Sequence, residues 1–217
     1  MDSGVWTIGI PSNILICGSS GAGKTVFVEK LLQNPHAWEK AVDNITYCYG
    51  IRTDTVDRIS DKFPEAVLIE NLPKELNSPL EMFSPKQNNL LILDDLSQES
   101  QNSKEFTNFL TRGSHHTNTC CISLEHFLYS DARERRKQSP HFHQIILFRN
   151  NRSMNQIALL ARQSGMVDAD VVKTAYRDVM GRDFAYLIVD TRNDTPDELR
   201  LLSNVFGENG DPPYTYI

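Results

Sequence analysis

Residues 14–25, with the sequence ILICGSSGAGKT, decide the fold of this chain. The apolar run at residues 14–17 predicts a buried strand, and apolar side chains at helical spacing over residues 24–33 predict a helix. Between them, residues 18–25 match the pattern G-x-x-x-x-G-K-[ST] at every specified position. A glycine-rich turn with a chance lysine is the alternative, but it leaves the full match and both flanking elements unexplained. The stretch therefore predicts a phosphate-binding loop.

Each position of this loop has a chemical role. Glycines let the backbone curl so that successive N–H groups point at phosphate oxygens, and the positive end of the following helix faces the same anion. Lys24 can reach the β- and γ-phosphates in binding and catalysis, and the Thr25 hydroxyl can bind Mg²⁺. The residues expected to hold the nucleotide are Gly18, Ser19, Ser20, Gly21, Ala22, Gly23, Lys24, Thr25 and Val26.

A second predicted site follows the apolar run at residues 90–93, which ends in two carboxylates. Asp94, last in the expected strand, is predicted to bind Mg²⁺. Asp95, just past the strand, is predicted to orient and deprotonate the attacking water. The alternative reading of Asp95 is the N-cap of a turn. Two carboxylates at a strand end favour nucleotide hydrolysis over phosphorylation of a small molecule, and no clear lid segment is visible.

The rest of the chain alternates strand-like and helical patterns. Apolar runs of strand length occur at residues 45–49, 66–69, 120–124, 145–148 and 186–189, and helical spacing occurs at 106–110, 154–161 and 171–179. Continuous apolar strands separated by helices predict an α/β fold with a mainly parallel sheet. With 217 residues, we expect one domain, 1–217, with a core at 14–190 and a C-terminal edge element at 191–217. Residues 73–89 read as a surface excursion, and residues 199–206 as one edge strand.

The composition is that of a soluble globular protein, with 40% hydrophobic and 23% charged residues. No apolar stretch approaches the ~18 residues of a membrane span, and the N-terminus has no secretory pattern. The four cysteines are too few and too irregular for a disulfide framework. We therefore expect an intracellular protein that is not secreted and has no membrane partner.

Charge is distributed unevenly. The net charge of −6 argues against a protein that mainly coats nucleic acid. Residues 101–163, however, contain nine Lys and Arg against four acids, and five of the six histidines. A nucleic-acid contact, if present, is expected within this basic, histidine-rich middle.

Four short runs resemble one known family. LTRGSHHTN at 110–118, LDDL at 93–96, LFRNNR at 147–152 and LARQ at 160–163 resemble the genome-packaging ATPases of eukaryotic double-stranded DNA viruses and Polinton/adintovirus-type elements, within the FtsK/HerA superfamily. The resemblance covers about residues 14–190. It implies a three-layer P-loop sandwich of the ASCE type with the phosphate-loop strand central.

The resemblance also implies a function. Such proteins form a homo-oligomeric ring that hydrolyses ATP with Mg²⁺ between neighbouring subunits and drives double-stranded DNA through the pore into a capsid. Implied partners are DNA, further copies of the chain and a capsid or portal vertex. The implied location is the nucleus or cytoplasm of a host cell, or a virion.

One position departs from the family pattern. The strand after the metal-binding acid normally ends in a polar sensor, usually glutamine, and here His126 stands at that position with Glu125 before it. A neutral imidazole can still hydrogen-bond a γ-phosphate or water, but it can also become charged at mildly acidic pH. This departure motivates a non-catalytic nucleotide-binding relative as one alternative function. A nucleoside or small-molecule kinase is another, although residues 113–116 have no role there.

Basic residues offer candidates for a trans-acting arginine. Arg136 matches the family's arginine between the sensor and the next strand, and Arg112 is the second candidate; a solvated surface cation is the alternative for each. The cluster at residues 133–137 is expected to face either DNA or solvent. His115 and His116 are expected to support the nucleotide site or contact a neighbouring subunit. The histidines and Cys120–Cys121 lack zinc-site spacing, so no zinc is predicted.

Overall fold

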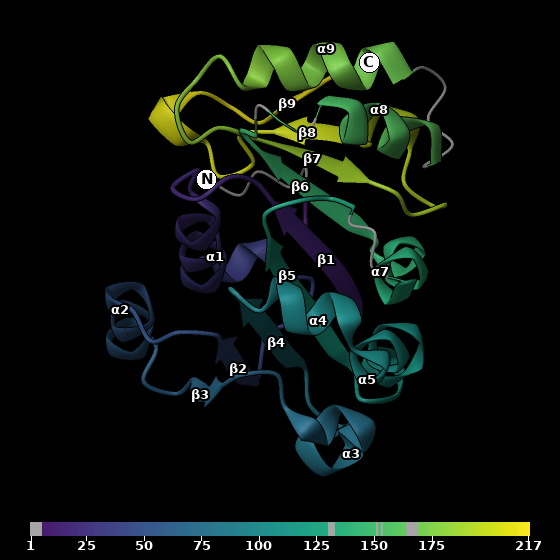
Figure 1. Cartoon of the computed structure of the whole chain (residues 1–217). Coiled ribbons are helices and arrows are strands. Elements are labelled where there is room, and N and C mark those ends of the chain that lie inside the picture. Colours follow the sequence, from purple (N-terminus) through teal and green to yellow (C-terminus); the bar gives the residue numbers. More distant parts are fainter. Residues whose placement is uncertain (1–5, 130–132, 151, 153, 164–168) are drawn as a thin grey trace.

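One mixed sheet forms the centre of the structure, a computed structural model that describes residues 6–129, 133–150, 152, 154–163 and 169–217. Within these residues the sheet has nine strands in the order β3-β2-β4-β5-β1-β6-β7-β8-β9 (Figure 1). The strands are β1 Ser12–Cys17, β2 Asn44–Tyr49, β3 Val67–Glu70, β4 Asn89–Asp94, β5 Thr119–Glu125, β6 Gln144–Phe148, β7 Tyr186–Asp190, β8 Leu201–Ser203 and β9 Tyr214–Thr215. The phosphate-loop strand β1 is central, as the resemblance implies.

Strand direction brings the predicted site residues to one edge. The strands from β3 through β6 in the sheet order are parallel, whereas β7, β8 and β9 pair antiparallel. Cys17 at the end of β1 pairs with Glu125 at the end of β5, and Leu93 of β4 pairs with Ser123 of β5. The carboxyl ends of β4, β5 and β1 therefore meet, which is where open α/β sheets bind ligands. The α/β fold with a mainly parallel sheet is confirmed.

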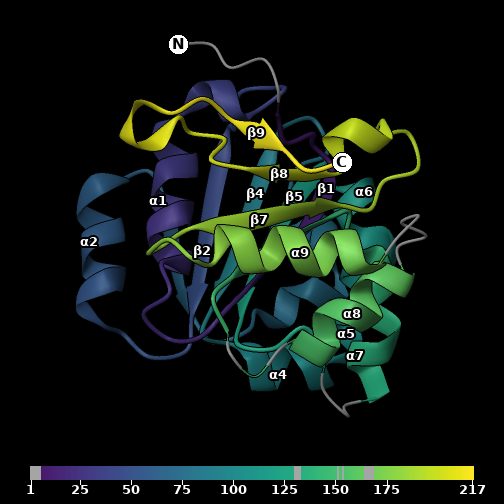
Figure 2. The same cartoon turned by 90° about the horizontal axis from the view of Figure 1, so that it is seen from above.

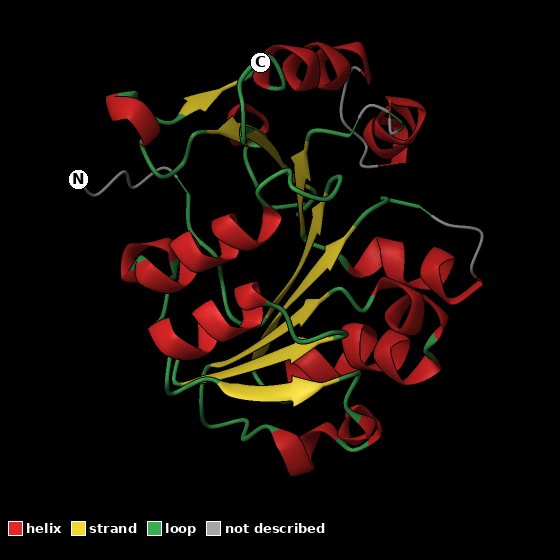
Figure 3. Cartoon of the chain, turned by 60° about the vertical axis from the view of Figure 1, so that its left-hand side comes forward, coloured by secondary structure: helices red, strands yellow, loops and turns green. Residues whose placement is uncertain are grey.

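Helices cover both faces of the sheet (Figure 3). They are α1 Lys24–Gln33, η1 Pro35–Ala37, α2 Asp54–Lys62, η2 Lys74–Asn77, α3 Pro79–Met82, α4 Ser97–Asn102, α5 Lys104–Asn108, η3 Phe109–Gly113, α6 Ser114–His116, α7 Arg133–Gln138, η4 Ser139–His141, α8 Met154–Gln163, α9 Ala169–Val179, η5 Asp197–Leu199 and η6 Glu208–Gly210. α1 and α2 pack on one face and α5, α8 and α9 on the other, with α9 lying along β7 and β8 (Figure 2). The result is the predicted three-layer arrangement.

The sheet has an apolar core on each of its two faces, and the alternation of side chains along β1 explains how one strand contributes to both. Ile14 and Ile16 are buried toward α1, while Leu15 and Cys17 are buried on the opposite face. Successive strand side chains point to opposite faces, so a strand covered on both sides reads as a continuous apolar run. Each fully buried Leu or Ile contributes roughly 1.5–3 kcal/mol of apolar transfer free energy. Burial on both faces holds β1 rigid beneath the phosphate loop.

The structure corrects several expectations. Residues 73–89 are not only a surface excursion, because Leu76 and Phe83 are buried in the core. The expected edge strand at 199–206 is shorter, β8, and a further strand, β9, lies outside it at the sheet edge. Helix α2 was not anticipated, because only Val56 and Ile59 on it are buried. Among the described helices, none has the length and apolar character to cross a membrane.

Candidate nucleotide-binding site

The phosphate loop joins β1 to α1 and is tied to two neighbouring strands. The Gly18 amide donates to the Glu125 carbonyl at 3.1 Å, and the Ser19 amide donates to the Arg149 carbonyl at 3.2 Å. Gly23 directly precedes α1 with a φ of 105°, a conformation that L side chains rarely adopt. These bonds hold the loop against the ends of β5 and β6.

Gly18 is required because no space is left for a side chain at this position. A Cβ atom at this position would lie 2.5 Å from the Cβ of Phe148, closer than real carbon atoms approach. Phe148 is buried at the end of β6. Because this neighbour is a packed core residue, the backbone of the loop can turn here only without a side chain.

Lys24 extends back along the loop. Its Nζ donates to the carbonyls of Gly18 at 2.8 Å and Ser19 at 3.2 Å. Burial lowers the pKa of Lys24, while the nearby carboxylates Asp94 and Asp95 act in the opposite direction. The ammonium group therefore lies inside the loop, beside the amides that would surround a phosphate.

Thr25 and Asp94 meet across the site. The Thr25 hydroxyl donates to Asp94 Oδ2 at 3.4 Å, although 69 positions separate the two residues. The buried Tyr47 on β2 donates its hydroxyl to the same oxygen at 2.5 Å. Burial raises the pKa of Asp94 above its ordinary value, and the hydrogen bonds from Tyr47 and Thr25 oppose that rise.

Tyr47 was missed by sequence reasoning. It belongs to an apolar, aromatic strand, and nothing in its local pattern points to Asp94. Only the pairing of β2 with β4 brings the two side chains together. The only local indication was a tyrosine in a strand-like run of residues, which is equally typical of ordinary core packing.

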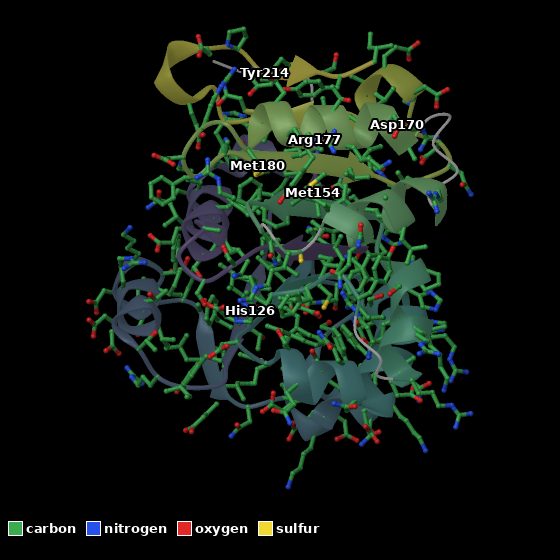
Figure 4. The ribbon with its side chains drawn as sticks, turned by 45° about the horizontal axis from the view of Figure 1, so that its top comes forward. His126, Met154, Asp170, Arg177, Met180 and Tyr214 are labelled. Atoms are coloured by element: carbon green, nitrogen blue, oxygen red, sulfur yellow. The ribbon has the colours of Figure 1, made fainter. Side chains whose placement is uncertain are left out.

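Asp95 and His126 also converge at this edge. His126 Nε2 lies 3.9 Å from Asp95 Oδ1, and the side chains of His126 and Asp95 are 39% and 64% exposed. His126 is labelled in Figure 4. Asp95 has a φ of 57°, and its carbonyl would lie 2.5 Å from a Cβ on Gly50. The turn after β4 is thus held against the end of β2, with the Asp95 carboxylate in solvent beside the imidazole.

Glu125, next to His126, forms a buried polar network. Arg135 Nη1 donates to Glu125 Oε1 at 3.1 Å, and Gln101 Nε2 donates to Glu125 Oε2 at 2.6 Å. Arg135 also donates to the Leu128 carbonyl from two nitrogens. Burial raises the pKa of Glu125, an effect that Arg135 opposes. The expectation that Arg135 faces DNA or solvent is wrong, because its guanidinium compensates a buried carboxylate.

The two candidate arginines lie in different places. Arg136 is exposed on α7 and borders a cavity of about 740 Å³ together with Leu159 and Leu160. Arg112 is exposed in η3, two residues after Leu110, whose carbonyl accepts from Asn13 at the start of β1. Arg112 is therefore at the amino edge of the sheet, opposite its own phosphate loop.

Three other histidines, His115, His141 and His143, gather at the same amino edge, where the His141 carbonyl accepts from the Asn13 side chain. The rings of His115 and His143 lie 5.9 Å apart, and His143 Nδ1 accepts from the Asn13 amide at 3.0 Å. His115 and His116 therefore do not support the nucleotide site of their own chain. In the described part of the chain, no group of three or more His, Cys, Asp or Glu residues is arranged to hold a metal ion.

No family model matches the chain, and no curated protein matches it. Several solved structures, however, are similar to the chain. B204, the DNA-packaging ATPase from Sulfolobus turreted icosahedral virus, is similar over 85% of this chain and 94% of its own, with a TM-score of 0.55 and 15% identity. EssC (ATPases 2 and 3) from Geobacillus thermodenitrificans is similar over 94% of this chain and 39% of its own, with a TM-score of 0.54 and 14% identity.

A third similar structure is the cytoplasmic domain of the type VII secretion ATPase EccC from Thermomonospora curvata. It covers 85% of this chain and 24% of its own, with a TM-score of 0.53 and 13% identity. At such identities the likeness shows the fold. The chain has the P-loop ATPase fold of these three proteins.

Proposed function

We propose that this chain is an ATPase that moves double-stranded DNA, and that it packages a viral or virus-like genome into a capsid. The observation that carries the ATPase assignment is the meeting of Lys24, Thr25 and Asp94 at one edge of the sheet, with Thr25 Oγ1 and Asp94 Oδ2 3.4 Å apart. The fold shared with a viral DNA-packaging ATPase supports the translocase assignment.

Binding of ATP follows from the loop. Its backbone amides and the N-terminus of α1 would surround the phosphates, with Lys24 neutralising the β- and γ-phosphates. Mg²⁺ typically takes oxygen ligands from one or two side chains and from phosphates. A hydroxyl and a carboxylate 3.4 Å apart are close to the ~3 Å that separates adjacent oxygens in an octahedral site with ~2.1 Å bonds. Thr25 and Asp94 therefore fit a site for this ion, which would neutralise charge that develops on the phosphates.

Hydrolysis would use the two residues beside the phosphates. Asp95 is the base that accepts a proton from the attacking water, and its exposed carboxylate lies past the end of β4. His126, 3.9 Å from Asp95, is placed to hydrogen-bond the same water or the γ-phosphate. This is the role that glutamine has in the family the chain resembles.

A ring of identical subunits would complete the site. A neighbour's arginine would stabilise the charge that spreads over the phosphoryl oxygens. Arg112 and Arg136 are both exposed, and Arg112 lies far from its own loop, as a trans-acting residue must. Exposed cations on α7, such as Arg133, would contact DNA phosphates. The proposed location is the host nucleus or cytoplasm, or the virion.

The test is the ATPase rate with and without double-stranded DNA, together with particle mass in a slowly hydrolysed ATP analogue. We expect DNA-stimulated hydrolysis by a ring-sized particle, no hydrolysis in Lys24→Ala or Asp95→Asn, and normal hydrolysis in Lys40→Ala, an exposed lysine outside the site. A flat rate from a monomer under all conditions would defeat the translocase proposal. Phosphoryl transfer to a nucleoside in place of water would support a kinase instead.

A further inference from the structure

Phe184 is an exposed aromatic residue that borders the phosphate loop. It precedes β7, and 70% of its surface is open to solvent. A Cβ on Gly23 would lie 3.4 Å from Phe184 Cδ1 and 3.5 Å from its Cβ, so the ring side chain stands in contact range of the loop. An exposed aromatic residue at this place gains little from folding, because its apolar surface remains in water.

The backbone of Phe184 is also strained. Its φ of 56° lies in the left-handed region, which costs free energy for a bulky side chain. Such conformations persist where surrounding contacts impose them, and they concentrate at ligand sites. The segment that leads into Phe184 is tied to the end of β6 by hydrogen bonds from Arg149.

Arg149 hydrogen-bonds both the segment just before Phe184 and the phosphate loop. Its Nε donates to the Met180 carbonyl at 3.1 Å and its Nη1 donates to Asp183 Oδ1 at 3.4 Å, in the segment that leads to Phe184 (Met180 is labelled in Figure 4). The carbonyl of Arg149 accepts from both the amide and the hydroxyl of Ser19, at 3.2 and 2.9 Å. Arg149 thus connects the phosphate loop with the segment that leads to Phe184.

From this geometry we propose that Phe184 is the surface on which the base of the bound nucleotide stacks. The inference rests on the proposed function, since it places the base of a nucleotide whose phosphates occupy the loop. An exposed aromatic ring beside the phosphate loop offers a nucleotide base a flat face for stacking. Such stacking is tolerant of base identity because every base has a π face. Phe184 would therefore add affinity for ATP and GTP alike.

The experiment compares binding of ATP, GTP and inorganic tripolyphosphate, each with Mg²⁺, by titration calorimetry. Phe184→Ala is expected to weaken the affinity for ATP and for GTP by about tenfold or more, since stacking of one base commonly has this magnitude. The affinity for tripolyphosphate, which has no base, should stay within about twofold of that of the unaltered protein. Phe127→Ala is the matched control, because Phe127 is 43% exposed at the same edge of the sheet. Phe184→Trp should retain ATP affinity, and its fluorescence should change with ATP but not with tripolyphosphate.

The outcomes separate this inference from the proposed function. The assignment of Phe184 would be overturned, without affecting the phosphate loop, by any of three results. These are an unchanged ATP affinity in Phe184→Ala, an equal loss of affinity for tripolyphosphate in that variant, and a base-dependent loss of affinity in Phe127→Ala. If the unaltered protein binds neither ATP nor tripolyphosphate, the proposed function fails as well. A melting curve of Phe184→Ala that matches the unaltered protein, together with the Phe184→Trp fluorescence, guards against a folding artefact.

Discussion

Glu125 and Arg135 form an ion pair that is closed to solvent, with 3.1 Å between Oε1 and Nη1 and exposed side-chain fractions of 0% and 1%. The pair links β5, whose last residue is hydrogen-bonded to the phosphate loop, to helix α7. The Glu125 carbonyl holds the loop through Gly18, and the guanidinium of Arg135 also lies 5.2 Å from the centre of the Phe142 ring. Removing one member of such a pair leaves an uncompensated charge, which is far costlier than losing a surface pair.

Arg135→Met is therefore expected to lower the free energy of unfolding by about 3–5 kcal/mol near neutral pH. The loss should shrink in acid. Burial already raises the pKa of Glu125, and the loss of Arg135 raises this pKa further. In the variant, folding therefore favours the protonated form of Glu125. The stability of the variant falls as the pH increases through the raised pKa. Urea denaturation at about pH 5 and about pH 8 measures the difference, with Arg133→Met as the exposed control on the same helix. A loss that does not vary with pH would contradict this account.

Tyr47→Phe should shift the pH dependence of hydrolysis. The Tyr47 hydroxyl stabilises the ionised form of Asp94, so its removal raises the pKa of Asp94. The proposed Mg²⁺ site needs Asp94 as a carboxylate, so the acidic limb of the ATPase profile is expected to move to higher pH. Rates of ATP hydrolysis, measured at saturating ATP over the acidic pH range, give the position of this limb. Tyr49→Phe, on the same strand, should leave the limb in place; an equal shift there would show that general packing is responsible.

Gly18→Ala is expected to destabilise the protein by about 1–3 kcal/mol and to abolish phosphate binding, because the added methyl group would overlap Phe148. Thermal melting and ATP titration measure the two effects. Gly9→Ala is the control, since its nearest neighbour is the end of the Glu39 side chain, which can move. Normal ATP affinity in Gly18→Ala would show that the loop is held less tightly than its contacts with β5 and β6 imply.

The role assigned to His126 predicts a graded series. His126→Gln should hydrolyse ATP at a rate within a few-fold of the unaltered protein, because an amide can make the hydrogen bond that the imidazole makes. His126→Ala should lose about 10²-fold or more while keeping ATP affinity. Single-turnover rates and ATP titration separate chemistry from binding. Full activity in His126→Ala would remove His126 from the site.

The proposed ring predicts that subunit mixing will identify the arginine that acts in trans. Lys24→Ala subunits have no working loop but carry both arginines, whereas Arg136→Ala or Arg112→Ala subunits carry an intact loop. If Arg136 acts in trans, mixing Arg136→Ala with Lys24→Ala should restore part of the ATPase activity that each lacks alone. The same mixture made with Arg112→Ala tests the second candidate. Failure of both mixtures, with rings still formed, would mean that neither arginine completes a neighbour's site.

The sequence by itself determined the phosphate loop, the acids after residue 93 and the α/β class. Each of these depends on neighbouring residues: a strand, a glycine turn and a helix adjoin in the chain, and the periodicity of apolar side chains shows which segments are buried. Asp94 was expected at a strand end, and it is the last residue of β4.

Only the tertiary structure decided which distant side chains meet. Periodicity does not specify strand order, so nothing local predicted that Tyr47 would contact Asp94 through the pairing of β2 with β4. Arg135 read as one of several exposed cations, yet the packing of α7 beside β5 buries it on Glu125. Phe184 stands beside Gly23, 161 positions earlier in the chain, and Arg149 hydrogen-bonds both of their segments. Local sequence specifies conformation and burial, whereas contacts between distant segments follow from how the sheet orders its strands and how the helices close over it.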